Sequence, residues 1–140
     1  MPASAVRKPP RQAQITDAAQ AGAGLRTFER IAHQWRLSAA DAMALVGVDA
    51  RSTYYELLKR AREKREVRGL SRDQLDRLSY LLGIYRSIGV LFPHSRETRD
   101  AWVSRANSSS LFAGRAPIDV MRSGIVGLYQ TFTHLAAARS

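Results

Sequence analysis

The side chains best suited to recognition chemistry follow a glycine-containing turn between two short amphipathic segments. They are polar or cationic residues that would begin a helix, namely Arg51, Ser52, Thr53 and Tyr55. A helix after a tight turn can place its first residues in the major groove of DNA. There arginine forks onto guanine or a phosphate, and hydroxyl groups donate to phosphate or meet a thymine methyl. The basic residues further along would neutralise the phosphate backbone: Lys59, Arg60 and Arg62.

A second interpretation of the same segment needs no nucleic acid. Tyr54 and Leu58 are expected in the core, and the charged residues would then form a solvated face with ion pairs one helical turn apart, for example at Glu63. The turn spacing combined with the basic run favours the nucleic-acid interpretation.

The sequence contains few residues of the types that enzymes use for catalysis. The sequence has no Cys, and its three His, at positions 33, 94 and 134, are scattered. No Ser stands in a G-x-S-x-G context, and no phosphate-binding glycine loop follows a strand pattern. We therefore predict no enzyme activity, no catalytic residues, no cofactor and no metal site.

The charge balance points to an anionic partner. The 140 residues carry 22 Lys plus Arg against 12 Asp plus Glu, a formal net charge of +10. The densest basic run extends from Arg51 to Arg68, and such a positive field attracts nucleic acid. No apolar run approaches a secretory segment or a membrane span, so we expect a cytoplasmic protein with no membrane partner.

Helical periodicity describes the first half of the chain after a flexible basic arm over residues 1–24, within which Arg7, Lys8 and Arg11 lack a nearby acid. Apolar residues at three- and four-residue spacing predict a first helix from Leu25 to Trp35. A cap at Ser38 and a left-handed stop at Gly47 bound a second helix. Asp49 or Ser52 is expected to cap a third helix that Gly69 closes. Residues 25–69 thus have helix-turn-helix spacing.

The second half, residues 70–140, is also predicted to be helical. Ser71 and Gln74 form a capping-box signature before an apolar stripe that we expect in the core: Leu75, Leu78, Leu82, Tyr85 and Ile88. Further helix starts are predicted at Ser95 and Pro117, and a last amphipathic helix follows Gly124. No strand pattern occurs, so the predicted fold class is all-α.

Taken together, these segments resemble the Xre/MbcA/ParS family of antitoxins. The resemblance covers residues 25–140 and consists of eight pieces in one order: W-x-L-S (35–38), LVGV (45–48), STYY (52–55), LSRDQLDRLSYLLGIYR (70–86), LFP (91–93), AW (101–102), LFAGRAPIDVMRSG (111–124) and LAAAR (135–139). No single piece is specific to the family, but the occurrence of all eight pieces in this order is.

The resemblance implies a Cro-like helix-turn-helix domain acting on the protein's own promoter, followed by a helical toxin-binding domain. The implied partners are operator DNA and a RES-domain toxin, which consumes NAD or uses it to modify a target. The antitoxin would occlude the toxin's NAD pocket as a homodimer within a hetero-oligomeric complex. The rival hypothesis is a stand-alone helix-turn-helix regulator with a C-terminal dimerisation domain.

The family's loop motif maps onto residues 107–119, where Ala113 replaces the motif's first Gly. The residues expected at the toxin are Asn107, Leu111, Phe112, Arg115, Pro117, Arg139 and Ser140. Large apolar side chains in a serine-rich loop gain most from a partner pocket, and arginine can bind a carboxylate with two hydrogen bonds. Alternatively, Leu111 and Phe112 pack under their own domain, Arg115 caps a helix end, and Arg139 is a solvated terminus.

Overall fold

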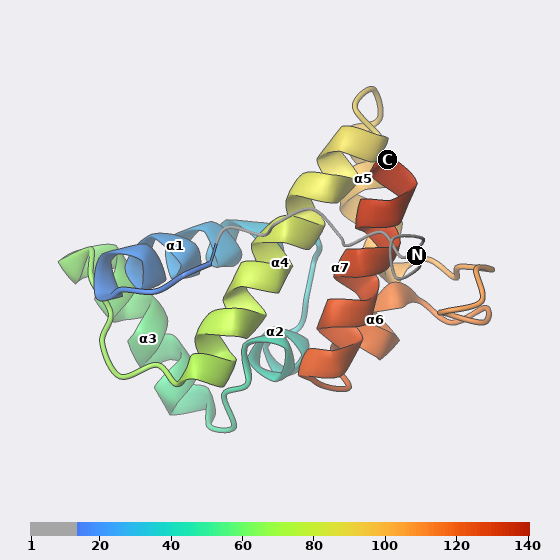
Figure 1. The fold of residues 1–140 in the computed structure, drawn as a ribbon. Helices are drawn as coiled ribbons and strands as arrows, with labels where there is room; N and C mark the ends of the chain where they lie inside the picture. Colours follow the sequence, from blue (N-terminus) through green and yellow to red (C-terminus); the bar gives the residue numbers. More distant parts are fainter. Residues whose placement is uncertain (1–13) are drawn as a thin grey trace, which may run out of the picture.

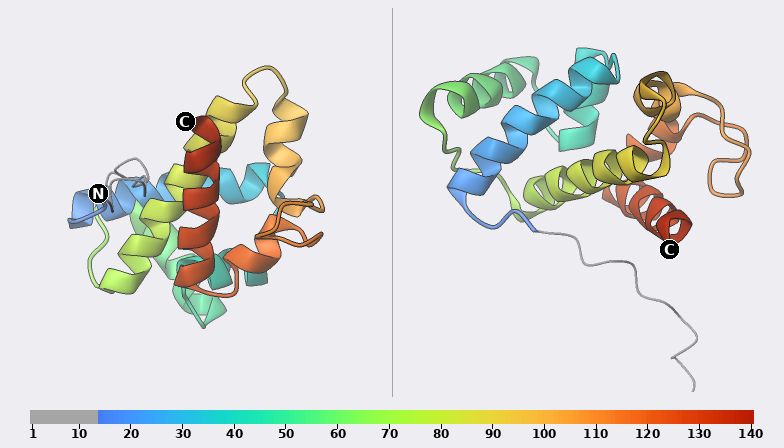
Figure 2. Two further views of the ribbon diagram at one scale, coloured as in Figure 1. Left: turned by 45° about the vertical axis from the view of Figure 1, so that its right-hand side comes forward. Right: turned by 90° about the horizontal axis from the view of Figure 1, so that it is seen from above.

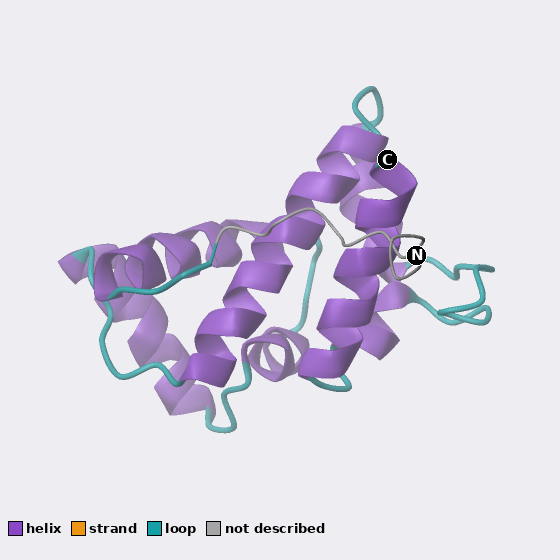
Figure 3. Ribbon diagram, in the orientation of Figure 1, coloured by secondary structure: helices purple, strands orange, loops and turns teal. Residues whose placement is uncertain are grey.

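The computed structural model describes residues 14–140, and every regular element in that range is a helix (Figures 1 and 3). The all-α fold class is therefore confirmed. The helices are α1 (Ala18–Gln34), α2 (Ala39–Val46), α3 (Arg51–Lys64), α4 (Arg72–Leu91), α5 (Arg96–Ala101), the 3-10 helix η2 (Trp102–Ser104), α6 (Pro117–Met121) and α7 (Ile125–Arg139).

The long helix α4 stands between the two halves of the molecule. It packs against α1 and α2 on one side and against α7 on the other (Figures 1 and 2). One hydrophobic core runs through these contacts and includes residues of both predicted domains, such as Leu25, Leu45, Leu81 and Leu128. The segments on either side of residue 70 thus share a core rather than burying separate ones.

Most predicted helix ends are confirmed because local capping chemistry sets them. The Ser38 side chain accepts a hydrogen bond from the backbone N–H of Asp41, and Gly47 adopts a left-handed conformation at φ 81°. Ser71 and Gln74 form both hydrogen bonds of a capping box. Ser95 caps α5, and Pro117 occupies the first turn of α6.

The chain enters the fold earlier than the sequence predicts, so the flexible-arm prediction is wrong for residues 14–24. Helix α1 begins at Ala18, capped by the Asp17 carboxylate. Ile15 is already in the core, and its backbone N–H donates to the Ser79 hydroxyl at 3.0 Å. Residues 1–13, with Arg7, Lys8 and Arg11, lie outside the described residues.

Helix α3 is also bounded differently from the prediction. Neither Asp49 nor Ser52 caps it; its N-cap is Ala50, which provides no side-chain hydrogen bond. The helix ends at Lys64, because Arg65 turns left-handed at φ 62°, well before Gly69. The Arg65 carbonyl then lies where a Cβ on Gly22 would stand, so this glycine allows α1 and the end of α3 to meet.

The inward face of α4 is wider than the predicted stripe. Leu78 and Ile88 are buried as expected, but Leu81 and Ile84, outside the stripe, are fully buried too. Tyr85 is 37% exposed and donates its hydroxyl hydrogen to the Gln34 side chain. Because α4 packs on two sides, a single stripe at helical spacing underestimates its buried surface.

Candidate nucleic-acid interface and C-terminal loop

Helices α2 and α3 form a helix-turn-helix whose turn is fixed by backbone geometry. The N–H groups of Gly47 and Val48 both donate to the Met43 carbonyl, at 2.9 and 3.0 Å. Gly47 supplies the positive φ at low cost, because it has no Cβ. Val48 is buried and anchors the turn to the core. The chain therefore leaves α2 in one direction and begins α3 at Arg51.

The first turns of α3 separate a buried face from an exposed one. Tyr54, Leu57, Leu58 and Ala61 are buried, as the sequence predicts for Tyr54 and Leu58. Burial, with a smaller contribution from Glu29, raises the pKa of Tyr54 to about 12, so its phenol stays neutral in the core. The other side chains of this part of α3, Arg51, Ser52, Thr53 and Tyr55, are exposed.

The start of α3 is open to an external acceptor. Ala50 has no side-chain oxygen for the N–H groups of the first turn. Within residues 14–140 no carboxylate forms an ion pair with Arg51. A helix N-terminus beside an unpaired guanidinium and two hydroxyls suits a phosphate or a base edge.

The basic residues further along α3 differ in availability. Lys59 is exposed, whereas Arg60 is half-buried and its Nε atom is buried with no hydrogen-bond partner among residues 14–140. Arg62 forms an ion pair of 3.4 Å with Glu29 of α1. Of the four basic residues of α3 that the sequence analysis assigns to DNA, Arg51 and Lys59 are therefore the two that are exposed and form no ion pair within residues 14–140.

The C-terminal loop is closed on itself at its base. The Asn107 N–H donates to the Arg115 carbonyl at 3.0 Å, and the Gly114 N–H donates to the Asn107 carbonyl at 2.8 Å. The Asn107 side chain also accepts from the Ser109 N–H at 3.0 Å. Ala113, where the family motif has Gly, adopts φ 53°, a conformation that glycine reaches without strain.

Two residues assigned to a toxin surface are buried in their own chain, and for them the assignment is wrong. Phe112 is 0% exposed and packs edge-on against Trp102 and His134, with ring centroids at 5.8 and 5.3 Å. Pro117 is buried at the start of α6. Leu111 is half-buried, and Arg115 is exposed with its Nε donating to the Phe112 carbonyl. A large loop hydrophobe here serves its own core.

The last residues of the chain fold back onto the helices. The Arg139 guanidinium donates to the hydroxyl of Ser87 on α4 at 3.2 Å, and the Ser140 hydroxyl donates to the Ala136 carbonyl at 3.1 Å. Both residues nevertheless remain exposed. Arg139 is therefore accessible but attached to α4 rather than extended into solvent.

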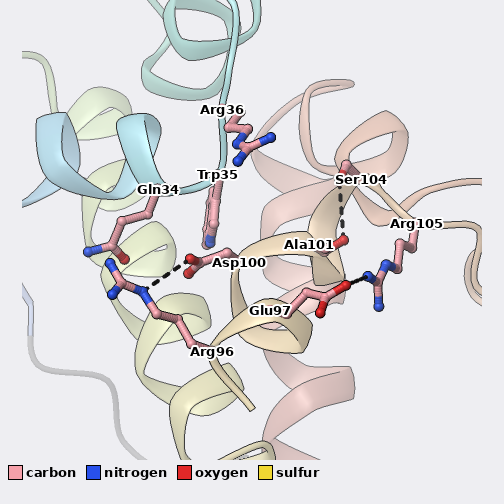
Figure 4. A pocket seen from close by; sticks show the side chains of 9 residues that line it. All are labelled: Gln34, Trp35, Arg36, Arg96, Glu97, Asp100, Ala101, Ser104 and Arg105. Carbon is pink, nitrogen blue, oxygen red and sulfur yellow. Dashed lines mark hydrogen bonds and ion pairs between the residues drawn. The ribbon is translucent and has the colours of Figure 1, made fainter.

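A cleft between the end of α1 and α5 has no counterpart in the sequence analysis (Figure 4). Its volume is about 670 Å³, and Arg36 borders it opposite two ion pairs, Arg105 with Glu97 at 3.2 Å and Arg96 with Asp100 at 3.7 Å. No local pattern could indicate it, because its two walls are about sixty residues apart in the chain.

Two comparisons with known proteins relate this chain to others, one over its helix-turn-helix half and one over most of its length. Residues 14–83, which contain α1, α2, α3 and the larger part of α4, match the family described as the antitoxin Xre-like helix-turn-helix domain. The chain is 35% identical over 125 residues to the uncharacterised protein y4oB of Sinorhizobium fredii, a match that covers 89% of this chain and 90% of the relative. Within residues 14–140 no helix is long and apolar enough to cross a membrane.

Proposed function

Because the chain belongs to the antitoxin Xre-like helix-turn-helix family, we propose that it represses its own operon and neutralises a RES-domain toxin. It is a DNA-binding regulator of the antitoxin type. The observation that carries the DNA half of the proposal is the exposed, uncapped start of α3, with Arg51, Ser52 and Thr53 beside one another. In this arrangement α3 reads the operator while Lys59 contacts phosphate.

The toxin half of the proposal rests on the family resemblance and on the residues that remain accessible in the C-terminal loop and at the end of α7. Arg115 and Arg139 are exposed cations, and Leu111 and Asn107 are half-buried beside the loop. These residues, with Ser140, form the surface that occludes the NAD pocket of the toxin. The chain acts there by covering the pocket and performs no reaction itself.

Self-association is part of the proposal. Val126 and Tyr129, three residues apart on α7, are 66% and 46% exposed, respectively, so two large apolar side chains share one exposed face of this helix. A homodimer through such a face would bring two recognition helices to two half-sites of an operator. The stand-alone regulator, in which the C-terminal half only dimerises the chain, remains the competing hypothesis.

Co-expression tests the two hypotheses against each other. The chain, carrying an affinity tag, is produced together with a RES-domain protein encoded beside it, and the complex and cellular NAD are measured. We expect co-purification and normal NAD, with NAD or growth falling when the RES-domain protein is produced alone. The stand-alone regulator would be favoured if the RES-domain protein does not co-purify with the chain, and if cells that produce the RES-domain protein grow equally with and without the chain.

Binding to DNA is expected to weaken steeply with salt, because Arg51 and Lys59 displace counterions from phosphates. Each neutralised phosphate contributes about −0.9 to the slope of log K against log salt concentration. Fluorescence anisotropy of a duplex from upstream of the gene, titrated at several salt concentrations, measures this slope. A slope near zero would contradict phosphate contacts by the basic side chains.

A further inference from the structure

Two side chains of α4 reach across to the helix-turn-helix turn. The Gln74 Nε2 donates to the Gly47 carbonyl at 3.0 Å, and the Arg77 Nη1 donates to the Ala44 carbonyl at 3.2 Å. Both acceptors lie at the end of α2, where the last carbonyls of a helix lack intrahelical partners. The turn before the recognition helix is therefore held from outside the α2–α3 pair.

Each of these side chains is itself held in place. Gln74 uses its other side-chain atom, Oε1, to accept from the Ser71 N–H at 3.0 Å, so one amide joins the cap of α4 to the turn. Arg77 is fixed by Asp73 at 2.7 Å, and its side chain is only 17% exposed. Its Cδ and Nε lie 3.1 Å from the place a Cβ on Gly47 would occupy, so the guanidinium stem covers the turn.

From this geometry we infer that Gln74 and Arg77 are positioning residues that fix the direction of α3 for DNA recognition, an inference that rests on the proposed DNA-binding function. Neither residue has to touch DNA to act. Base-edge hydrogen bonds need side chains placed to within a fraction of an ångström, whereas phosphate contacts tolerate displacement. Loosening the turn should therefore reduce discrimination between sequences more than it reduces general affinity for DNA.

Gln74→Glu separates the two roles of the amide. A glutamate still accepts from the Ser71 N–H, as in the common capping box, but it cannot donate to the Gly47 carbonyl. The matched control is Gln20→Glu, which adds the same charge away from the turn. The Gln20 side chain only accepts, from Thr16 near the start of α1, so a glutamate can keep both hydrogen bonds.

The readouts are the dissociation constants for the upstream duplex and for an unrelated duplex at one salt concentration, the urea midpoint, and amide hydrogen exchange. The ratio that measures discrimination is the dissociation constant for the unrelated duplex divided by that for the upstream duplex. For Gln74→Glu we expect this ratio to fall by about threefold to tenfold, the effect of one lost hydrogen bond. Exchange should accelerate at the Gly47 and Val48 amides, which donate to the Met43 carbonyl. The urea midpoint should fall by no more than the loss of one hydrogen bond explains. Gln20→Glu should change neither the ratio nor the exchange.

Several outcomes would overturn the inference. An unchanged ratio would do so, and so would a lower ratio with unchanged exchange in the turn, because the charge alone would then explain it. Should Gln74→Glu unfold the protein, Arg77→Met provides the same test by removing the donor to Ala44. If the wild type itself fails to prefer the upstream duplex, the proposed function fails, while exchange in the turn still reports on the contact from α4.

Discussion

Replacing Phe112 with alanine is expected to lower the free energy of unfolding by about 3–5 kcal/mol. The ring is 0% exposed and packs between Trp102 and His134, so its removal leaves a cavity lined by η2, the loop and α7. Urea unfolding followed by circular dichroism measures the loss through the midpoint and slope. Toxin binding should weaken only to the extent that the loop and α7 lose their packing.

The neighbouring residues provide the matched comparison for Phe112. Leu111→Ala alters a half-buried side chain, so it should destabilise the protein less than Phe112→Ala does, and Arg115→Ala alters an exposed one, so it should unfold close to the wild type. Under the proposed function they weaken the complex with the RES-domain protein directly. A Phe112→Ala variant that keeps its urea midpoint yet loses the complex would return Phe112 to the contact surface.

What the sequence predicts correctly is set by neighbours in the chain. Ser38 caps α2 because the acceptor and donor are three residues apart, and Gly47 ends it because only the local backbone must turn left-handed. The same holds for the capping box at Ser71. Such ends depend on side-chain chemistry within one helical turn, which a single sequence displays directly.

What the sequence does not predict depends on partners far along the chain. Ile15 joins the core because Ser79 and Arg72 of α4 bind its backbone. Phe112 is buried because Trp102 and His134 meet around it. Local composition makes residues 14–24 resemble an arm, and the serine-rich context together with the family resemblance makes Phe112 resemble a docking residue. Neither pattern contains the distant partner of these residues.

The candidate DNA surface also combines features that the local sequence predicts with features that depend on residues far along the chain. The exposure of the polar side chains at the start of α3 agrees with the sequence analysis because Tyr54 and Leu58, one helical turn apart, identify the inward face from the sequence alone. The sequence does not predict the ion pair of Arg62 with Glu29 or the hydrogen bond from Gln74 to Gly47, because the partners lie far apart in the chain. Charge counts therefore locate the basic run but do not say which of its cations are already paired.

Replacing Arg51 with alanine is expected to weaken binding to the upstream duplex by about 5- to 150-fold, corresponding to roughly 1–3 kcal/mol. Arg51 is the first residue of α3 and is exposed, and no carboxylate within residues 14–140 forms an ion pair with it. Its guanidinium therefore keeps its donors for a base edge or a phosphate. Fluorescence anisotropy at constant salt measures the change.

The control for Arg51→Ala is Arg96→Ala, which removes the same charge from a side chain that is 80% exposed on α5. A contact with a base edge weakens binding to the upstream duplex alone, because an unrelated duplex offers no matching acceptors. A contact with phosphate weakens binding to both duplexes equally, and Arg51→Lys then retains most of the affinity. Equal affinities for Arg51→Ala and Arg96→Ala would remove the start of α3 from the interface, since the loss would then reflect net charge alone.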